Sequence, residues 1–169
     1  MVIRTIEQVN RVLGRIAAYC ALVMMLAQVF SVVARYVFSY GIISVQETVV
    51  YGHALIFLLG SAFVLQENAH VRVDVFYGAV KARTRRMIDI VGLAFFALPV
   101  ALLILWYAYP YVARSWSTLE GSRQAGGLPA VYLLKSAILI FAASIALQVI
   151  ATLARIFGGK NWGENTDVV

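Results

Sequence analysis

IAAYCALVMMLAQVFSVVA, residues 16–34, is an uninterrupted apolar run between Arg15 and Arg35. A helix of this length rises about 28 Å, close to the ~30 Å hydrocarbon core of a bilayer. Three further runs contain no Asp, Glu, Lys or Arg and are as long or longer: residues 48–66, 90–113 and 136–154. Because an unpaired backbone amide is costly in lipid, each run should be a transmembrane helix. The pattern therefore predicts an all-α integral membrane protein with four spans.

The composition of the chain supports the same conclusion. Its 169 residues are 62% hydrophobic and 13% charged, whereas soluble domains are about 45–50% apolar and about 25% charged. Four spans leave little room for a soluble domain, so we expect one four-helix membrane domain over residues 1–169. The single cysteine, Cys20, lies within the first run and can form no internal disulfide. We expect it to be a small packing residue.

Basic residues are distributed unequally between the two sides of the predicted membrane domain. Ten lie on the side of the termini and the middle loop: Arg4, Arg11, Arg15, Arg72, Lys81, Arg83, Arg85, Arg86, Arg155 and Lys160. Four lie on the other side: Arg35, Arg114, Arg123 and Lys135. The positive-inside rule therefore predicts cytoplasmic N- and C-termini. The net charge of +6 gathers at span ends, which indicates contact with lipid phosphate and no nucleic-acid partner.

Two segments on the predicted cytoplasmic side have the pattern of short interfacial amphipathic helices. At the N-terminus, one helical face carries Arg4, Glu7, Arg11 and Arg15, and the opposite face carries Ile6, Val9, Leu13 and Ile16. In the middle loop, apolar residues recur at helical spacing: Val73, Phe76, Tyr77 and Val80. Residues 70–75 also alternate as a strand would, but a lone strand has no partner, so we favour the helix.

The functional candidates inside the spans are uncharged polar residues. In the second span, a seven-residue spacing places four residues in one stripe: Gln46, His53, Gly60 and Glu67. Gln28 lies in the first span, and the fourth span carries Ser144, Gln148 and Thr152 at a spacing of four. Polar and small residues collect where helices touch helices. These residues either hold the chain's own helices together or face a separate subunit, and the pattern leaves both readings open.

No Asp, Glu, Lys or Arg lies within a span and His53 is the only histidine there, which argues against an ion-coupled carrier acting alone. The alternative is a haem- or quinone-binding membrane anchor of a redox complex. A membrane haem usually needs two facing histidines, whereas His70 lies about 25 Å further along the axis of the same helix as His53. We therefore expect no cofactor, no metal and no catalytic residue.

An ordered set of short motifs resembles the small membrane subunit, DctQ-like, of tripartite ATP-independent periplasmic (TRAP) transporters. The motifs are Arg35-Tyr36-Val37-Phe38, Glu47 at the start of span two, Gly60-Ser61-Ala62, His70-Val71-Arg72-Val73-Asp74 and Gly127-Leu128-Pro129. The resemblance covers about residues 10–157. Family members often carry a Trp and two acidic residues at the start of span two, where this chain has Ser44-Val45-Gln46-Glu47.

The resemblance implies a multi-pass protein of the bacterial inner membrane. Such a protein is a non-catalytic scaffold in a secondary-active uptake system for organic acids. Its expected partners are a large TRAP membrane subunit, a periplasmic solute-binding protein and the lipid bilayer. We expect the subunit interface to include Gln46, Glu47, His53, Gly60, Gln28 and Gln148. We expect the loop anchors to be Arg35, His70, Arg72 and Asp74.

Overall fold

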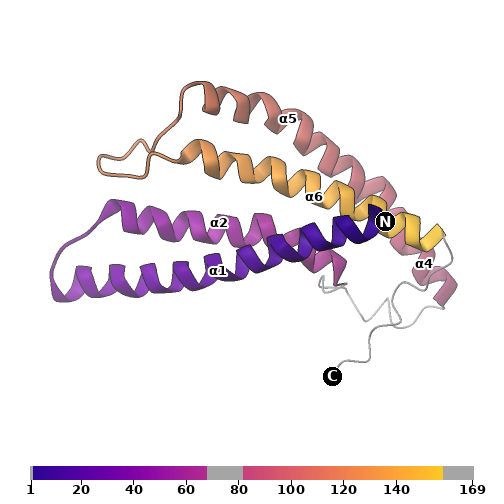
Figure 1. Ribbon diagram of the computed structural model, residues 1–169, viewed down its shortest axis with the longest axis horizontal. Helices are drawn as coiled ribbons and strands as arrows, with labels where there is room; N and C mark the ends of the chain where they lie inside the picture. Colours follow the sequence, from indigo (N-terminus) through magenta and orange to yellow (C-terminus); the bar gives the residue numbers. More distant parts are fainter. Residues whose placement is uncertain (1, 68–81, 158–169) are drawn as a thin grey trace.

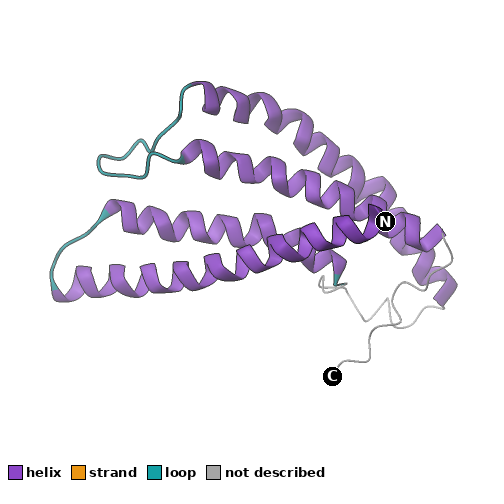
Figure 2. Cartoon of the chain, viewed as in Figure 1, coloured by secondary structure: helices purple, strands orange, loops and turns teal. Residues whose placement is uncertain are grey.

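The computed structural model describes residues 2–67 and 82–157, and every regular element in these two ranges is a helix (Figure 2). The elements in chain order are α1 (Val2–Val37), α2 (Ile43–Gln66), α4 (Ala82–Val91), the π-helix η1 (Gly92–Ala97), α5 (Leu98–Ser117) and α6 (Val131–Phe157). The described residues contain four helices long and apolar enough to cross a membrane. The sequence-based prediction of an all-α protein with four spans is confirmed.

Each uncharged run lies inside a helix that extends beyond it. The largest extension is in α1, which begins at Val2 and is continuous to Val37. The predicted N-terminal amphipathic segment is therefore helical, but it is not a separate helix. The chain has no proline before Pro99, so nothing interrupts the helix between this segment and residues 16–34. At about 54 Å, α1 is longer than a hydrocarbon core is thick.

The helices form two antiparallel hairpins, α1–α2 and α5–α6, joined by packing of α2 against α6 (Figure 1). We call the end with residues 38–42 and 118–130 the hairpin end. The opposite end, where α1 begins and α6 ends, is the terminal end. The central helix is α6, which has nine buried residues, against four in α1 and three each in α2 and α5. Among the described residues, nothing covers the outer faces of α1, α2 and α5.

The first hairpin packs closely because of a glycine in α2. A Cβ added to Gly52 would lie 2.9 Å from the Cβ of Met24 and 3.4 Å from the Cys20 carbonyl oxygen. Cys20 therefore lies in the α1–α2 contact, as its predicted packing role requires. Small residues at such a crossing let two backbones approach, which is a main source of helix association in lipid.

The third span is one rod, Arg83–Ser117, in which the helix widens to a π-turn over Gly92–Ala97. Pro99 follows directly, as the second residue of α5. A proline has no N–H to donate and its ring clashes with the carbonyl four residues earlier. A wider turn before Pro99 relieves that clash. A second proline, Pro110, lies inside α5.

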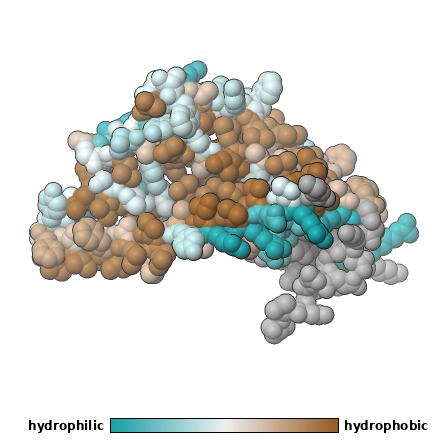
Figure 3. Space-filling model, in the orientation of Figure 1, coloured by the Kyte–Doolittle hydropathy of each residue, from teal (hydrophilic) through white to brown (hydrophobic). Residues whose placement is uncertain are grey.

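The surface separates apolar helix faces from a hydrophilic region at the terminal end (Figure 3). Exposed polar residues along the N-terminal part of α1 belong to this region: Arg4, Gln8, Arg11 and Arg15. They follow the helical spacing of one face, and the neighbouring Glu7 and Asn10 turn toward the helix contacts and are buried. The second predicted amphipathic segment, residues 73–80, and the alternating residues 70–75 lie outside the described residues.

Candidate functional site

Three of the four residues in the polar stripe of α2 face away from the other described helices. Gln46, His53 and Glu67 are exposed, and Gly60 is half-buried. Two apolar residues on the same helical face, Val50 and Phe57, are 61% and 64% exposed. The His53 ring meets the Phe57 ring edge-on, with centroids 5.0 Å apart.

His53 lies near the middle of its span, where lipid tails offer no hydrogen bond. The Gln28 side chain in α1 is exposed as well, so both helices of the first hairpin present a polar group outward. Polar side chains in transmembrane segments are usually satisfied by another helix. Gly60 lies at the edge of the stripe next to α1, where an added Cβ would meet the Cβ of Ala17 at 3.8 Å, an ordinary van der Waals distance.

The polar stripe of α6 faces inward. Ser144, Gln148 and Thr152 are all buried. The Asn10 side-chain amide donates to Oε1 of Gln148 over 2.7 Å, and Gln148 Nε2 donates to the Thr152 hydroxyl over 3.4 Å. Gln148 of the α6 stripe thus joins the first and last described helices, whereas Gln46, His53 and Glu67 of the α2 stripe are exposed. Of the two possibilities that the sequence left open, contact within the chain holds for Gln148 of the α6 stripe.

Asn10 and Glu7 carry a terminal-end network that the sequence analysis missed. The buried carboxylate of Glu7 forms an ion pair with Arg155 of α6. With its side-chain amide oriented to satisfy both neighbours, Gln66 of α2 donates to the Glu7 carbonyl oxygen over 3.1 Å and accepts from Arg11 Nε over 3.2 Å. The signal was present in the sequence, since Glu7 and Asn10 are three residues apart and share a helical face.

Glu47 is engaged by its own chain at the hairpin end. It lies in the second turn of α2, and its carboxylate accepts hydrogen bonds from the Ser122 hydroxyl and from the Leu128 backbone N–H, the latter over 2.6 Å. A Cβ on Gly127 would lie 2.8 Å from Glu47 Oε1. Glycine at this position lets the loop backbone reach the carboxylate, so α2 holds the 118–130 loop against the first hairpin.

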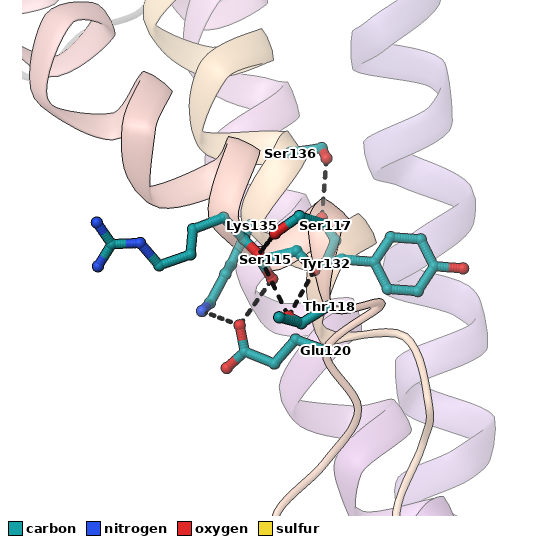
Figure 4. A network of polar contacts seen from close by, with 8 residues as sticks. Ser115, Ser117, Thr118, Glu120, Tyr132, Lys135 and Ser136 are labelled. Atoms are coloured by element: carbon teal, nitrogen blue, oxygen red, sulfur yellow. Dashed lines mark hydrogen bonds and ion pairs between the residues drawn. The ribbon is translucent and has the colours of Figure 1, made fainter.

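A second carboxylate, Glu120, fixes the start of the same loop (Figure 4). The end of α5 is a Schellman turn, in which Glu120 N donates to the Ser115 carbonyl oxygen over 3.0 Å and Leu119 has φ of 45°. This turn brings the Glu120 carboxylate to the Ser115 hydroxyl at 2.7 Å and to the Lys135 ammonium of α6. The hydrogen bond from Lys135 is the main reason that the pKa of Glu120 is lowered, and the Ser115 hydrogen bond adds to it.

The other predicted residues are placed as follows. Arg35 is exposed at the end of α1. The loop anchors His70, Arg72 and Asp74 lie outside the described residues. Within residues 2–67 and 82–157, no group of three or more His, Cys, Asp or Glu side chains is arranged to hold a metal ion. Among the residues that the structure describes, nothing supports the haem or quinone alternative.

The described helices place the chain in the class of multi-pass α-helical membrane proteins, with polar side chains exposed on its spans. The family model for tripartite ATP-independent periplasmic transporters, DctQ component, matches residues 21–159. The chain therefore belongs to the DctQ family of TRAP transporter components, and the resemblance noted in the sequence is confirmed. A component of a tripartite system has partner subunits. No curated protein and no solved structure matches the chain.

Proposed function

We propose that this chain is a non-catalytic scaffold subunit of a TRAP-type uptake system for organic acids. It lies in the inner membrane of a bacterium with both termini in the cytoplasm. It packs against the large transport subunit, which carries substrate and coupling ions. The absence of Asp, Glu, Lys and Arg from its four uncharged runs supports a role outside the transport path.

The observation that carries the proposal is the exposure of His53 near mid-span, in line with Gln46 and Glu67. We define the α2 stripe as Gln46, Val50, His53, Phe57, Gly60 and Glu67. It follows a seven-residue repeat along one side of the helix, which is the spacing of a helix–helix seam. A partner helix along the α2 stripe would bury Val50 and Phe57 and give His53 a hydrogen-bond partner.

The hairpin-end loop is proposed to help dock the periplasmic solute-binding protein. Glu47 and Glu120 hold this loop from two sides. Arg123 and Gln124 at its tip are exposed. A loop held in one conformation loses little entropy on binding a soluble partner.

Co-purification tests the scaffold role. The His53→Leu variant should insert normally but recover less of the large subunit, because a transmembrane polar contact is worth about 0.6 kcal/mol on average and up to about 1.7. Tyr107→Leu is the matched control, since it removes a polar group from an exposed position on the other hairpin. Equal recovery of the large subunit with both variants would contradict the proposal.

A further inference from the structure

The hydroxyl of Tyr51 in α2 is buried without a hydrogen bond. The residue as a whole is half-buried, but its Oη is shut off from solvent and has no hydrogen-bond partner among the described residues. A buried hydroxyl in this position has given up its bonds to water and gained none in return, which destabilises the arrangement that contains it. An unpaired group of this kind therefore needs a structural explanation.

The acceptor best placed for this hydroxyl is Glu47, and the 118–130 loop already occupies it. Glu47 precedes Tyr51 by four residues, so the two side chains share one face of α2, one turn apart. Glu47 Oε1 accepts from the Ser122 hydroxyl and Oε2 accepts from the Leu128 N–H. With its carboxylate held in this way, Glu47 accepts nothing from Tyr51.

The part of the loop that binds Glu47 has hydrogen bonds of its own. Ser122 N donates to the Leu128 carbonyl oxygen and Gly127 N to the Gln124 carbonyl oxygen, each over 3.0 Å. Gln124 N also donates to the Ser122 hydroxyl oxygen over 3.1 Å. We call residues 122–128 the latch segment. Because it is bonded within itself, it can leave α2 as a unit without losing its own structure.

Glu120 is the other carboxylate whose charge acts on the Tyr51 hydroxyl. It pairs with Lys135 of α6 and accepts from the Ser115 hydroxyl of α5. Neither bond involves the latch segment. Movement of the segment would therefore release the carboxylate of Glu47 and leave Glu120 where it is.

We infer that Glu47 is a two-position latch. In the closed arrangement, which is the one described above, Ser122 and Leu128 bind its carboxylate and the Tyr51 hydroxyl is unpaired. In the open arrangement, Tyr51 donates to Glu47, while the Ser122 hydroxyl and the Leu128 N–H bond to water. The Tyr51 hydroxyl thus favours opening. The latch consists of residues of this chain alone, so it does not depend on the function proposed above.

Hydrogen exchange of the full chain in lipid nanodiscs tests the latch. The readout is the Leu128 amide, which is bonded to Glu47 in the closed arrangement and exposed in the open one. Tyr51→Phe keeps the ring and removes the hydroxyl. It should slow exchange at Leu128 at least roughly tenfold, because opening no longer gains a hydrogen bond to a charged group.

Two controls separate this effect from general ones. Tyr36→Phe removes a tyrosine hydroxyl that is exposed at the hairpin end of α1, and it should leave exchange at Leu128 unchanged. The Ser122 amide is bonded within the latch segment. Its exchange should therefore not follow the change at Leu128 in Tyr51→Phe. Circular dichroism establishes that each variant is folded.

A double variant identifies the acceptor. Glu47→Ala removes the carboxylate from both arrangements, so adding Tyr51→Phe to it should have no further effect on exchange at Leu128. A slowing that persists in the Glu47→Ala background would overturn the inference and assign the hydroxyl to Glu120. Unchanged exchange at Leu128 in Tyr51→Phe alone would overturn it as well. So would faster exchange, which would show that the hydroxyl holds the closed arrangement together.

Discussion

The side-chain amide of Asn10 donates to Oε1 of Gln148 over 2.7 Å, and both side chains are 1% exposed. This bond joins the first turns of α1 to the last turns of α6, across 138 positions of sequence. It shows that the terminal end of the protein is held by polar contacts between helices. The buried polar side chains of α6 are thereby satisfied within the chain, whereas Gln46 and His53 of α2 are exposed.

Removing either partner of this bond should destabilise the fold. Asn10→Leu or Gln148→Leu leaves one buried amide unpaired, at a cost of about 1–3 kcal/mol in the free energy of unfolding. The double substitution should cost less than the sum of the two single ones. Reversible unfolding in mixed micelles measures both. The control is Gln8→Leu, at an exposed position of α1, which should change the free energy of unfolding by no more than about 0.5 kcal/mol. If the two single variants lost no more stability than this control, the prediction would be refuted.

The crossing of α1 and α2 should depend on Gly52 and not on Gly60. In Gly52→Leu the new Cβ would lie 2.9 Å from the Cβ of Met24, which is too close. Overpacking of this kind lowers the free energy of unfolding by about 1–3 kcal/mol. Gly60→Ala has room, with its nearest neighbour at 3.8 Å. The same unfolding assay should show a clear loss for the first variant only. A tolerated Gly52→Leu would mean that the hairpin packs differently.

Glu47 should protect the backbone amide of Leu128 from hydrogen exchange. Glu47→Ala removes the acceptor, and hydrogen bonds to charged groups contribute about 1.5–3 kcal/mol. The Leu128 amide should therefore exchange roughly 10- to 100-fold faster. Glu67→Ala, which removes the exposed carboxylate just beyond α2, serves as the control. Unchanged exchange at Leu128 in Glu47→Ala would show that the loop is held by other contacts.

The hairpin end should weaken in acid because the pKa of Glu120 is lowered in the folded protein. A carboxyl group with a lowered folded pKa contributes stability above its unfolded pKa, about 4.3, and loses it as the pH falls through the folded value. Wild type should therefore exceed Glu120→Gln in melting temperature at neutral pH. The difference should shrink below about pH 4.3. A difference that stays constant down to the lowest pH at which the protein remains folded would contradict the assignment.

The sequence predicted the four spans because charge is excluded from lipid-spanning segments, and this signal is local. It did not distinguish the α2 stripe from the α6 stripe, since both consist of polar and small residues at helical spacing. Which stripe is buried depends on α6 lying between α2 and α5, and that arrangement is a property of the whole fold.

Contacts between residues far apart in the chain could not be predicted from the sequence either. The role of Glu47 depends on Leu128, 81 positions later, and no local pattern links the two. Arg155 is one of the basic residues that predict cytoplasmic termini, and the sequence does not show that it also pairs with Glu7. The N-terminal pattern predicts a short interfacial helix, yet the segment continues into the first span, and its polar face is divided between the exposed Arg4 and the buried Glu7.

The central claim is that the α2 stripe faces a separate subunit. Site-specific photocross-linking in intact membranes tests it most directly, with His53→benzoylphenylalanine as the probe and Tyr107→benzoylphenylalanine as the control on α5. The account predicts a cross-link from position 53 to a large multi-span polypeptide and none from position 107. Adducts with lipid alone from position 53, or with a second copy of this chain, would contradict it.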